Sequence, residues 1–229
     1  MIHDATLQHA SEGASAEPAA AMSGRSSAGW YAARGKRLLD LLLLALVAPV
    51  AAPLVLMLAI IARLDGGPAL YAQPRVGRGG RLFRCWKIRS MVVDADKRLE
   101  DYLEAHPAAR IEWDRDQKLR NDPRITAFGR LVRSTSLDEL PQLWNILTGE
   151  MSFVGPRPFT PNQISLYRGV SYYSLRPGLT GPWQVGERNG SGFAARAAYD
   201  TGYARDLSFA LDLGILLRTV GVVLSRTGQ

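Results

Sequence analysis

The sequence predicts an α+β fold that is mainly helical, with a proline-broken, re-entrant membrane helix and a small cytosolic domain that contains a short β-hairpin. Three observations lead to this fold class. Residues 38–62 are almost wholly apolar. Residues 69–73 and 81–89 have strand-like composition and flank a glycine-rich turn, and much of the remaining chain has the charged or apolar runs of helices. The 229 residues suffice for one moderate domain with appendages.

Residues 1–33 are rich in Ala, Ser and Gly and show no helical or strand period, so we expect a disordered N-terminal tail. They do not resemble a signal peptide, because the following apolar run starts too late and is too long. The predicted organisation is therefore a tail (1–33), a membrane helix (34–64) and a cytosolic domain (65–229).

The apolar run would form a straight helix of about 37 Å, enough to cross a hydrocarbon core of about 30 Å. However, Pro49 and Pro53 lie near its middle, where each removes a backbone hydrogen bond and bends the helix. Basic residues flank both ends, which places both ends in the cytoplasm by the positive-inside rule. A helix that enters the membrane, breaks at the prolines and returns satisfies both facts. An ordinary span with a proline kink is the alternative.

The two strand-like runs and the glycine-rich turn at 77–80 predict a hairpin. Residues 92–118 predict a charged helical region in two parts, broken at Pro107, with a solvated face. Further helices are expected over 125–132 and 140–147, the second ending at Gly149. Residues 155–158 (Gly-Pro-Arg-Pro) form a rigid loop. Residues 207–224 predict a helix that is buried or lies on a membrane.

Composition restricts the chemistry. The net charge of +7 favours anionic partners such as nucleic acid, acidic lipid or a sugar nucleotide. The single cysteine, Cys85, excludes an internal disulfide and a thiolate metal site. Two of the three histidines, His3 and His9, lie in the tail, so a histidine-based active site is not expected. No nucleic-acid motif or stacking stripe of aromatic residues is present, so we expect no nucleic-acid partner.

The adjacent carboxylates Asp138 and Glu139 are the main candidates for catalysis. The run Ser136-Leu-Asp-Glu fits a capping box, and Pro141 favours a later helix start with Asp138 as the N-cap. In either register both acids lie at the positive end of a helix dipole, which favours the ionised form. An ionised carboxylate beside Mg²⁺ can attack phosphorus, and its neighbour can hold the metal or a proton. The alternative is that both acids only cap a helix.

Basic residues in rigid elements flank the two acids in sequence, and arginine forks suit phosphate oxygens. In the loop at 155–158, two prolines restrict the backbone around the arginine, so its guanidinium is held with little loss of entropy. The alternative is a basic surface that faces anionic lipid, worth about 1 kcal/mol per residue. The candidate phosphate-binding residues are Lys87, Arg89, Arg133 and Arg157.

Short motifs extend along nearly the whole chain after the tail, and together they are a far more specific signal than any one of them. They are Lys36-Arg-Leu-Leu-Asp40, Arg75-Val-Gly77, Lys87-Ile-Arg-Ser-Met91, Leu137-Asp-Glu-Leu140, Met151-Ser-Phe-Val-Gly-Pro-Arg-Pro158, Arg176-Pro-Gly-Leu-Thr-Gly181 and the run Asp206–Asp212.

In these motifs the chain resembles the bacterial sugar transferases, the monotopic polyprenyl-phosphate phosphoglycosyl transferases. Details such as Cys85, Pro141-Gln-Leu-Trp-Asn145 and Gly181-Pro-Trp-Gln184 are most similar to the exopolysaccharide branch, which starts repeat units with a hexose-1-phosphate, galactose or glucose. The resemblance implies an enzyme of the bacterial inner membrane with its active site on the cytoplasmic face. It also implies a Ser-Pro hinge in the membrane helix, where this chain has Ala52-Pro53 and an additional Pro49.

The mechanism implied by the resemblance has two steps. Asp138, with Mg²⁺, attacks the β-phosphorus of a UDP-hexose and UMP leaves; undecaprenyl phosphate then takes the phosphosugar from the aspartate. Glu139 supports the metal and the acceptor proton, while Arg133 and Arg157 clamp phosphate oxygens, with Lys87 and Arg89 in second place. Membrane lipid is a further partner, and a homodimer is compatible with the sequence. The competing hypotheses are a non-catalytic, basic membrane-anchored scaffold and a soluble nucleic-acid binder.

Overall fold

The computed structural model describes residues 29–64, 66–116, 119–186 and 193–224. Most of the predicted tail lies outside the described residues. Its last part, residues 29–33, is helical, so the first helix begins before the predicted boundary. A π-helical segment, η1 (Tyr31–Gly35), leads directly into α2 (Lys36–Arg63). Together they are the one helical stretch, within the described ranges, that is long and apolar enough to cross a membrane.

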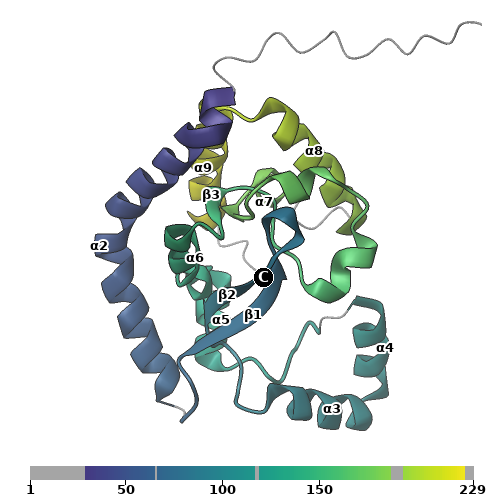
Figure 1. Cartoon of the computed structure of the whole chain (residues 1–229). Helices are drawn as coiled ribbons and strands as arrows, with labels where there is room; N and C mark the ends of the chain where they lie inside the picture. Colours follow the sequence, from purple (N-terminus) through teal and green to yellow (C-terminus); the bar gives the residue numbers. More distant parts are fainter. Residues whose placement is uncertain (1–28, 65, 117–118, 187–192, 225–229) are drawn as a thin grey trace, which may run out of the picture.

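The helix α2 is continuous, so the predicted break at the prolines is wrong. Figure 1 shows α2 bowed along one flank of the domain, with its concave side toward the domain. Pro49, Ala52 and Pro53 are exposed, whereas Ala51 is buried. Because residues two apart in a helix point to nearly opposite sides, the two prolines occupy the outer, convex face. Their missing hydrogen bonds bend the helix around the domain, while packing along the inner face keeps it continuous.

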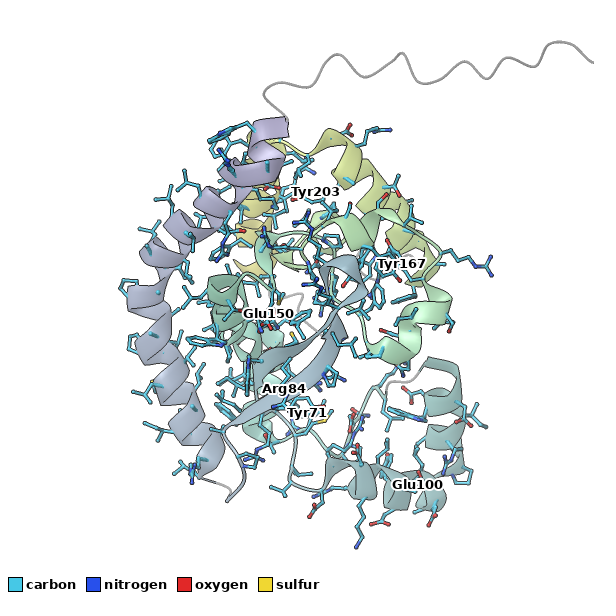
Figure 2. All side chains as sticks on the ribbon, in the orientation of Figure 1. Tyr71, Arg84, Glu100, Glu150, Tyr167 and Tyr203 are labelled. Atoms are coloured by element: carbon cyan, nitrogen blue, oxygen red, sulfur yellow. The ribbon has the colours of Figure 1, made fainter. Side chains whose placement is uncertain are left out.

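Polar contacts tie α2 to the domain at both of its ends. Near its start, Lys36 Nζ lies 2.6 Å from Asp212 Oδ2 and donates to the Tyr203 hydroxyl at 2.9 Å. Figure 2 shows Tyr203 toward the end of the domain where α2 begins. At the other end, Arg89 donates from Nη2 to the carbonyl of Ala62 at 2.6 Å. The helix therefore lies lengthwise against a single domain.

The predicted hairpin is confirmed. Strands β1 (Leu70–Val76) and β2 (Leu82–Ile88) pair antiparallel, and β1 is longer than expected. At the turn, Gly79 and Gly80 have φ of 69° and 78°, a region that favours glycine. The hairpin lies near the centre of the molecule (Figure 1).

The predicted two-part helical region is also confirmed: α3 (Ala95–Ala105) and α4 (Pro107–Asp116) are separated at Pro107 and lie at the edge of the molecule (Figure 1). The expected helix before the two acids is α5 (Ala127–Ser134), which the Thr126 side chain caps. The remaining elements are η2 (Arg78–Gly80), η3 (Leu137–Glu139), α6 (Gln142–Thr148), β3 (Ser152–Val154), η4 (Pro161–Leu166), η5 (Ser171–Ser174), β4 (Gly178–Thr180), α7 (Pro182–Val185), η6 (Phe193–Ala195), α8 (Arg196–Asp206) and α9 (Phe209–Leu224).

Buried apolar side chains join the elements that carry the candidate site. One cluster connects α2, β2, α6 and α9, and a second connects the end of α2 with β2 and α5. The parallel pair β3 and β4, which the sequence did not predict, leads into the rigid loop at 155–158. The predicted helix over 207–224 is α9, which buries Asp212 and Ile215 against the domain.

Candidate active site

The two adjacent acids lie in the 3₁₀ turn η3, and not at the start of a long helix as expected. Ser136 has a left-handed φ of 57° and forms no side-chain cap, and α6 begins only at Gln142 with Pro141 as its N-cap. The predicted capping box and the predicted N-cap role of Asp138 are therefore wrong. The backbone turns once more before α6 because η3 forms its own hydrogen bonds, including Glu139 N to the Ser136 carbonyl at 3.2 Å.

Asp138 is buried, with 7% of its surface exposed. Burial raises the pKa of its carboxyl, while the positive charges of Lys87 and Arg133 lower it. The sequence predicted that a helix dipole would favour the ionised form. In the structure, nearby cations oppose the effect of burial instead, and α6 has only seven residues.

Lys87, on β2, brings its ammonium to both acids. Lys87 Nζ lies 2.9 Å from Glu139 Oε1 and 3.9 Å from Asp138 Oδ2. Arg157 Nη2, from the rigid loop after β3, approaches the same Glu139 oxygen at 3.4 Å. Lys87, the dyad and Arg157 come from three separate parts of the sequence, so the fold gathers two acids and two cations at one place.

The other two predicted phosphate-binding residues, Arg133 and Arg89, lie in different environments. Arg133, at the end of α5, is close enough for its charge to lower the pKa of Asp138. Arg89 instead donates to backbone carbonyls of Pro68 at 2.6 Å, Met91 at 2.9 Å and Ala62 at 2.6 Å. Its guanidinium holds the end of α2 against the hairpin, so the prediction of Arg89 as a phosphate ligand does not fit the structure.

The residues present fit a magnesium ion that is shared with a substrate. Across the described parts of the chain, no group of three or more His, Cys, Asp or Glu residues could hold a metal without other ligands. Mg²⁺ commonly binds through one or two carboxylates together with substrate phosphates. Asp138 and Glu139 offer two carboxylates, so a diphosphate substrate would have to supply the other oxygens.

Sequence reasoning missed a second group of cations near Arg157. Arg75 on β1 donates from Nη1 to the carbonyl of Pro158 at 3.2 Å. Arg196, the first residue of α8, has its guanidinium carbon 4.1 Å from the centroid of the Trp183 ring. Arg75 lies within one of the motifs named above, but no local pattern distinguishes Arg196, because Trp183, Arg75 and Arg157 come from other parts of the sequence.

The model of a protein family described as bacterial sugar transferase matches residues 31–226. The chain belongs to this family. The family predicted from the motifs is therefore confirmed, and the match covers nearly all of the described residues.

Curated relatives share this bacterial sugar transferase region. The chain is 48% identical over 196 residues to the UDP-galactose-lipid carrier transferase of Erwinia amylovora and 46% identical over 195 residues to the undecaprenyl-phosphate galactose phosphotransferase of Salmonella typhimurium. Each match covers 84% of this chain and 41% of the relative. It is 43% identical over 195 residues to the exopolysaccharide production protein ExoY of Rhizobium meliloti, covering 83% of this chain and 86% of ExoY. The chain therefore spans about two fifths of the length of the first two relatives.

Proposed function

We propose that this sugar transferase is an undecaprenyl-phosphate sugar phosphotransferase. It moves hexose-1-phosphate from a UDP-hexose to undecaprenyl phosphate, the first membrane step of exopolysaccharide repeat-unit synthesis. The observation that carries the proposal is the buried Asp138 carboxylate beside Glu139 with the Lys87 ammonium next to both. The N-cap positions of η3 and α6 are Ser136 and Pro141 and not the two acids, which argues against a scaffold in which the acids are only caps.

In the first step, a carboxylate oxygen of Asp138 attacks the β-phosphorus of the donor. The bond from this phosphorus to the bridging oxygen breaks, UMP leaves with the electron pair, and the phosphosugar remains on the aspartate. Lys87 and Arg133 favour the ionised form of Asp138 that the attack needs, since their charges oppose the effect of burial on its pKa. Arg157 and Lys87 lie where they can hold phosphate oxygens during the transfer.

Magnesium would be held by Asp138 and Glu139 together with the donor diphosphate. When bound, the ion neutralises charge that develops on the phosphate oxygens. Glu139 lies between Lys87 and Arg157, which holds its side chain in position beside the nucleophile.

In the second step, a phosphate oxygen of undecaprenyl phosphate attacks the same phosphorus. The bond to Asp138 breaks, the carboxylate is regenerated, and the sugar leaves on a lipid diphosphate. Glu139 takes up a proton if the acceptor phosphate arrives protonated. Because UMP leaves before the acceptor reacts and the phosphosugar is carried on Asp138 between the two steps, the reaction is ping-pong.

We place α2 in the cytoplasmic leaflet of the inner membrane with both ends on the cytoplasmic side. Its outer face is apolar and exposed, as Leu42, Leu46 and Leu56 illustrate at 61%, 75% and 63% exposure. Since Lys36 and Ala62 both contact the same domain, a span perpendicular to the membrane would carry the domain into the lipid. The unbroken, bowed α2 is re-entrant in the sense that it enters the leaflet without crossing it.

The test uses the full chain in lipid nanodiscs with undecaprenyl phosphate and a panel of UDP-sugars, measured as UMP release. We expect turnover with UDP-galactose or UDP-glucose, and galactose is the first choice because two of the relatives above are named for it. Without undecaprenyl phosphate, the enzyme should release up to about one equivalent of UMP per enzyme molecule from a labelled donor and keep the labelled sugar on the protein.

Asp138→Asn should abolish transfer while the protein still associates with the membrane, because the change removes the anionic nucleophile and preserves the size of the side chain. The control is Asp101→Asn, which changes an exposed acid on α3. Turnover near the wild-type rate in Asp138→Asn would reject the covalent mechanism, and no turnover of wild type with any UDP-sugar would reject the function.

A further inference from the structure

Arg196 has an unusual environment for a cation. Its guanidinium carbon lies 4.1 Å from the ring centroid of Trp183 and 4.8 Å from that of Phe193. At these distances the cation interacts with the faces of aromatic rings, which do not accept hydrogen bonds from its N–H groups as an anion would. The Nε of Arg196 is buried without a hydrogen-bond partner. A buried donor without a partner is unfavourable, and a bound acceptor would relieve that cost.

Two further arginines converge on Arg196. Burial lowers the pKa of Arg196, and the positive charges of Arg157 and Arg75 lower it further, to about 10. Arg75 donates to Gln73 and to the carbonyl of Pro158, the residue after Arg157, and its own Nε is also buried without a partner. Three partly buried cations therefore repel one another around the rigid loop at 155–158.

The nearby acids offset these positive charges only in part, since the charge of Asp200 acts on Arg196 and that of Glu139 acts on Arg75. Asp200, one turn along α8 from Arg196, accepts a hydrogen bond from the Tyr167 hydroxyl at 2.6 Å. Burial raises the pKa of Asp200 to about 6, so this acid loses its charge under mildly acidic conditions. Glu139 contacts both Lys87 and Arg157. The region therefore has an excess of positive charge in partly buried positions, and an anion would relieve it.

We propose that Arg75, Arg157 and Arg196 form a second anion subsite, beside the reaction centre, which binds the phosphate of the nucleoside monophosphate half of the donor. This inference rests on the proposed function and assigns the part of the site that holds the leaving nucleotide. Arg157 belongs to both places, because it contacts Glu139 at 3.4 Å and its charge acts on Arg196. A nucleoside diphosphate sugar would thus place its sugar-bearing phosphate at Asp138 and its other phosphate at the arginines.

The position of the subsite favours a water-soluble nucleotide over the phosphate of a lipid. In Figure 1, α8 runs from the side of the domain away from α2, the helix whose exposed apolar face suits lipid, up to the start of α2, where Tyr203 contacts Lys36. Figure 2 shows Tyr167, the partner of Asp200, on that same far side. We therefore assign Arg75 and Arg196 to the nucleotide phosphate, while Arg157, which contacts Glu139, can also meet a phosphate at the dyad.

Binding of UMP and of uridine to the full chain in detergent, measured by calorimetry, tests the inference. For wild type we expect UMP to bind at least about tenfold more tightly than uridine, which corresponds to about 1.4 kcal/mol for the phosphate. Arg196→Gln should weaken UMP binding at least tenfold and leave uridine binding unchanged. Arg196→Lys should fall between the two, since it keeps the charge and loses the fork. The matched control is Arg168→Gln, an exposed arginine between η4 and η5.

Equal binding of UMP and uridine by wild type would overturn the inference, and this comparison does not depend on whether any variant folds. UMP binding to folded Arg196→Gln within about twofold of wild type would overturn it as well. If Arg196→Gln instead raises the KM for undecaprenyl phosphate and leaves UMP binding unchanged, the subsite belongs to the lipid acceptor and the assignment is wrong. Failure of the proposed function is distinct, because it appears as absent turnover in wild type while UMP binding is still measured.

Discussion

Replacing Lys87 with glutamine should shift the pH dependence of the donor half-reaction to higher pH. Burial raises the pKa of Asp138, and Lys87 is the strongest of the charges that lower it. Since the nucleophile must be ionised, activity is present above this pKa and is lost as the pH falls through it. Without Lys87 the pKa rises further, so activity is lost at a higher pH than in wild type.

The distance between the two charges sets the magnitude. Lys87 Nζ lies 3.9 Å from Asp138 Oδ2, and two unit charges about 4 Å apart interact by about 4 kcal/mol at an effective dielectric constant of about 20. This energy is an upper limit for the effect of Lys87 on the ionisation of Asp138. Lys87 Nζ also pairs with Glu139 Oε1 at 2.9 Å, which reduces its effect on Asp138. The charge of Arg133 still acts on Asp138 when Lys87 is replaced. We therefore expect the acidic limb to move to higher pH by less than this upper limit allows.

The assay is the initial rate of UMP release at saturating donor between about pH 5.5 and about pH 9.5. Lys87→Gln should lose most activity at the acidic end and recover part of it at the alkaline end. The control, Lys97→Gln, removes an exposed lysine of α3 and should keep the wild-type profile. An equal fractional loss at every pH would refute the reasoning, because it would show that Lys87 binds phosphate without acting on the ionisation of Asp138.

Two other predictions follow from the burial of Asp200 and from the packing of α2. Burial raises the pKa of Asp200 from 3.8 to about 6. As the pH rises from about 4 to about 6, the free energy of unfolding therefore falls, by at most about 3 kcal/mol from this group. Asp200→Asn should therefore flatten the fall in melting temperature across this range, and an unchanged slope would contradict the expectation. In a Cys85→Ser background, cysteines introduced at Ser26 and Ala69 should both react with a label only from the cytoplasm, because both ends of α2 contact one domain. Labelling of the Ser26 position from the periplasm would instead show that the helix crosses the membrane.

The sequence by itself determined the elements whose signals are local. The glycine-rich turn between two strand-like runs specified the hairpin, and Pro107 separated α3 from α4, because proline and glycine act on the backbone at their own position. Gly149, with φ of 82°, ends α6 as expected. The motifs along the chain also identified the family, and they singled out Asp138 and Glu139 before any geometry was known.

The tertiary structure decided the local conformation wherever packing competed with a local preference. Proline predicts a break in α2, but contacts along the whole inner face keep the helix continuous, and the prolines only bend it. Likewise Ser136 and Glu139 fit a capping box, yet the chain forms the 3₁₀ turn η3 that holds Asp138 in a buried position. In both cases the deciding contacts are made by residues distant in sequence.

The tertiary structure also decided which cations serve the site. Lys87 and Glu139 are 52 residues apart and meet at 2.9 Å, whereas Arg89, two residues after Lys87, holds the end of α2. Arg196 meets Trp183 only because α7 packs against α8. Arg89 follows the last residue of β2, so it lies beside the end of α2, whereas Lys87 within the strand lies beside the two acids. Sequence could name the charged residues but not their neighbours, because side chains that are remote in the chain are brought together only by the packing of the elements that carry them.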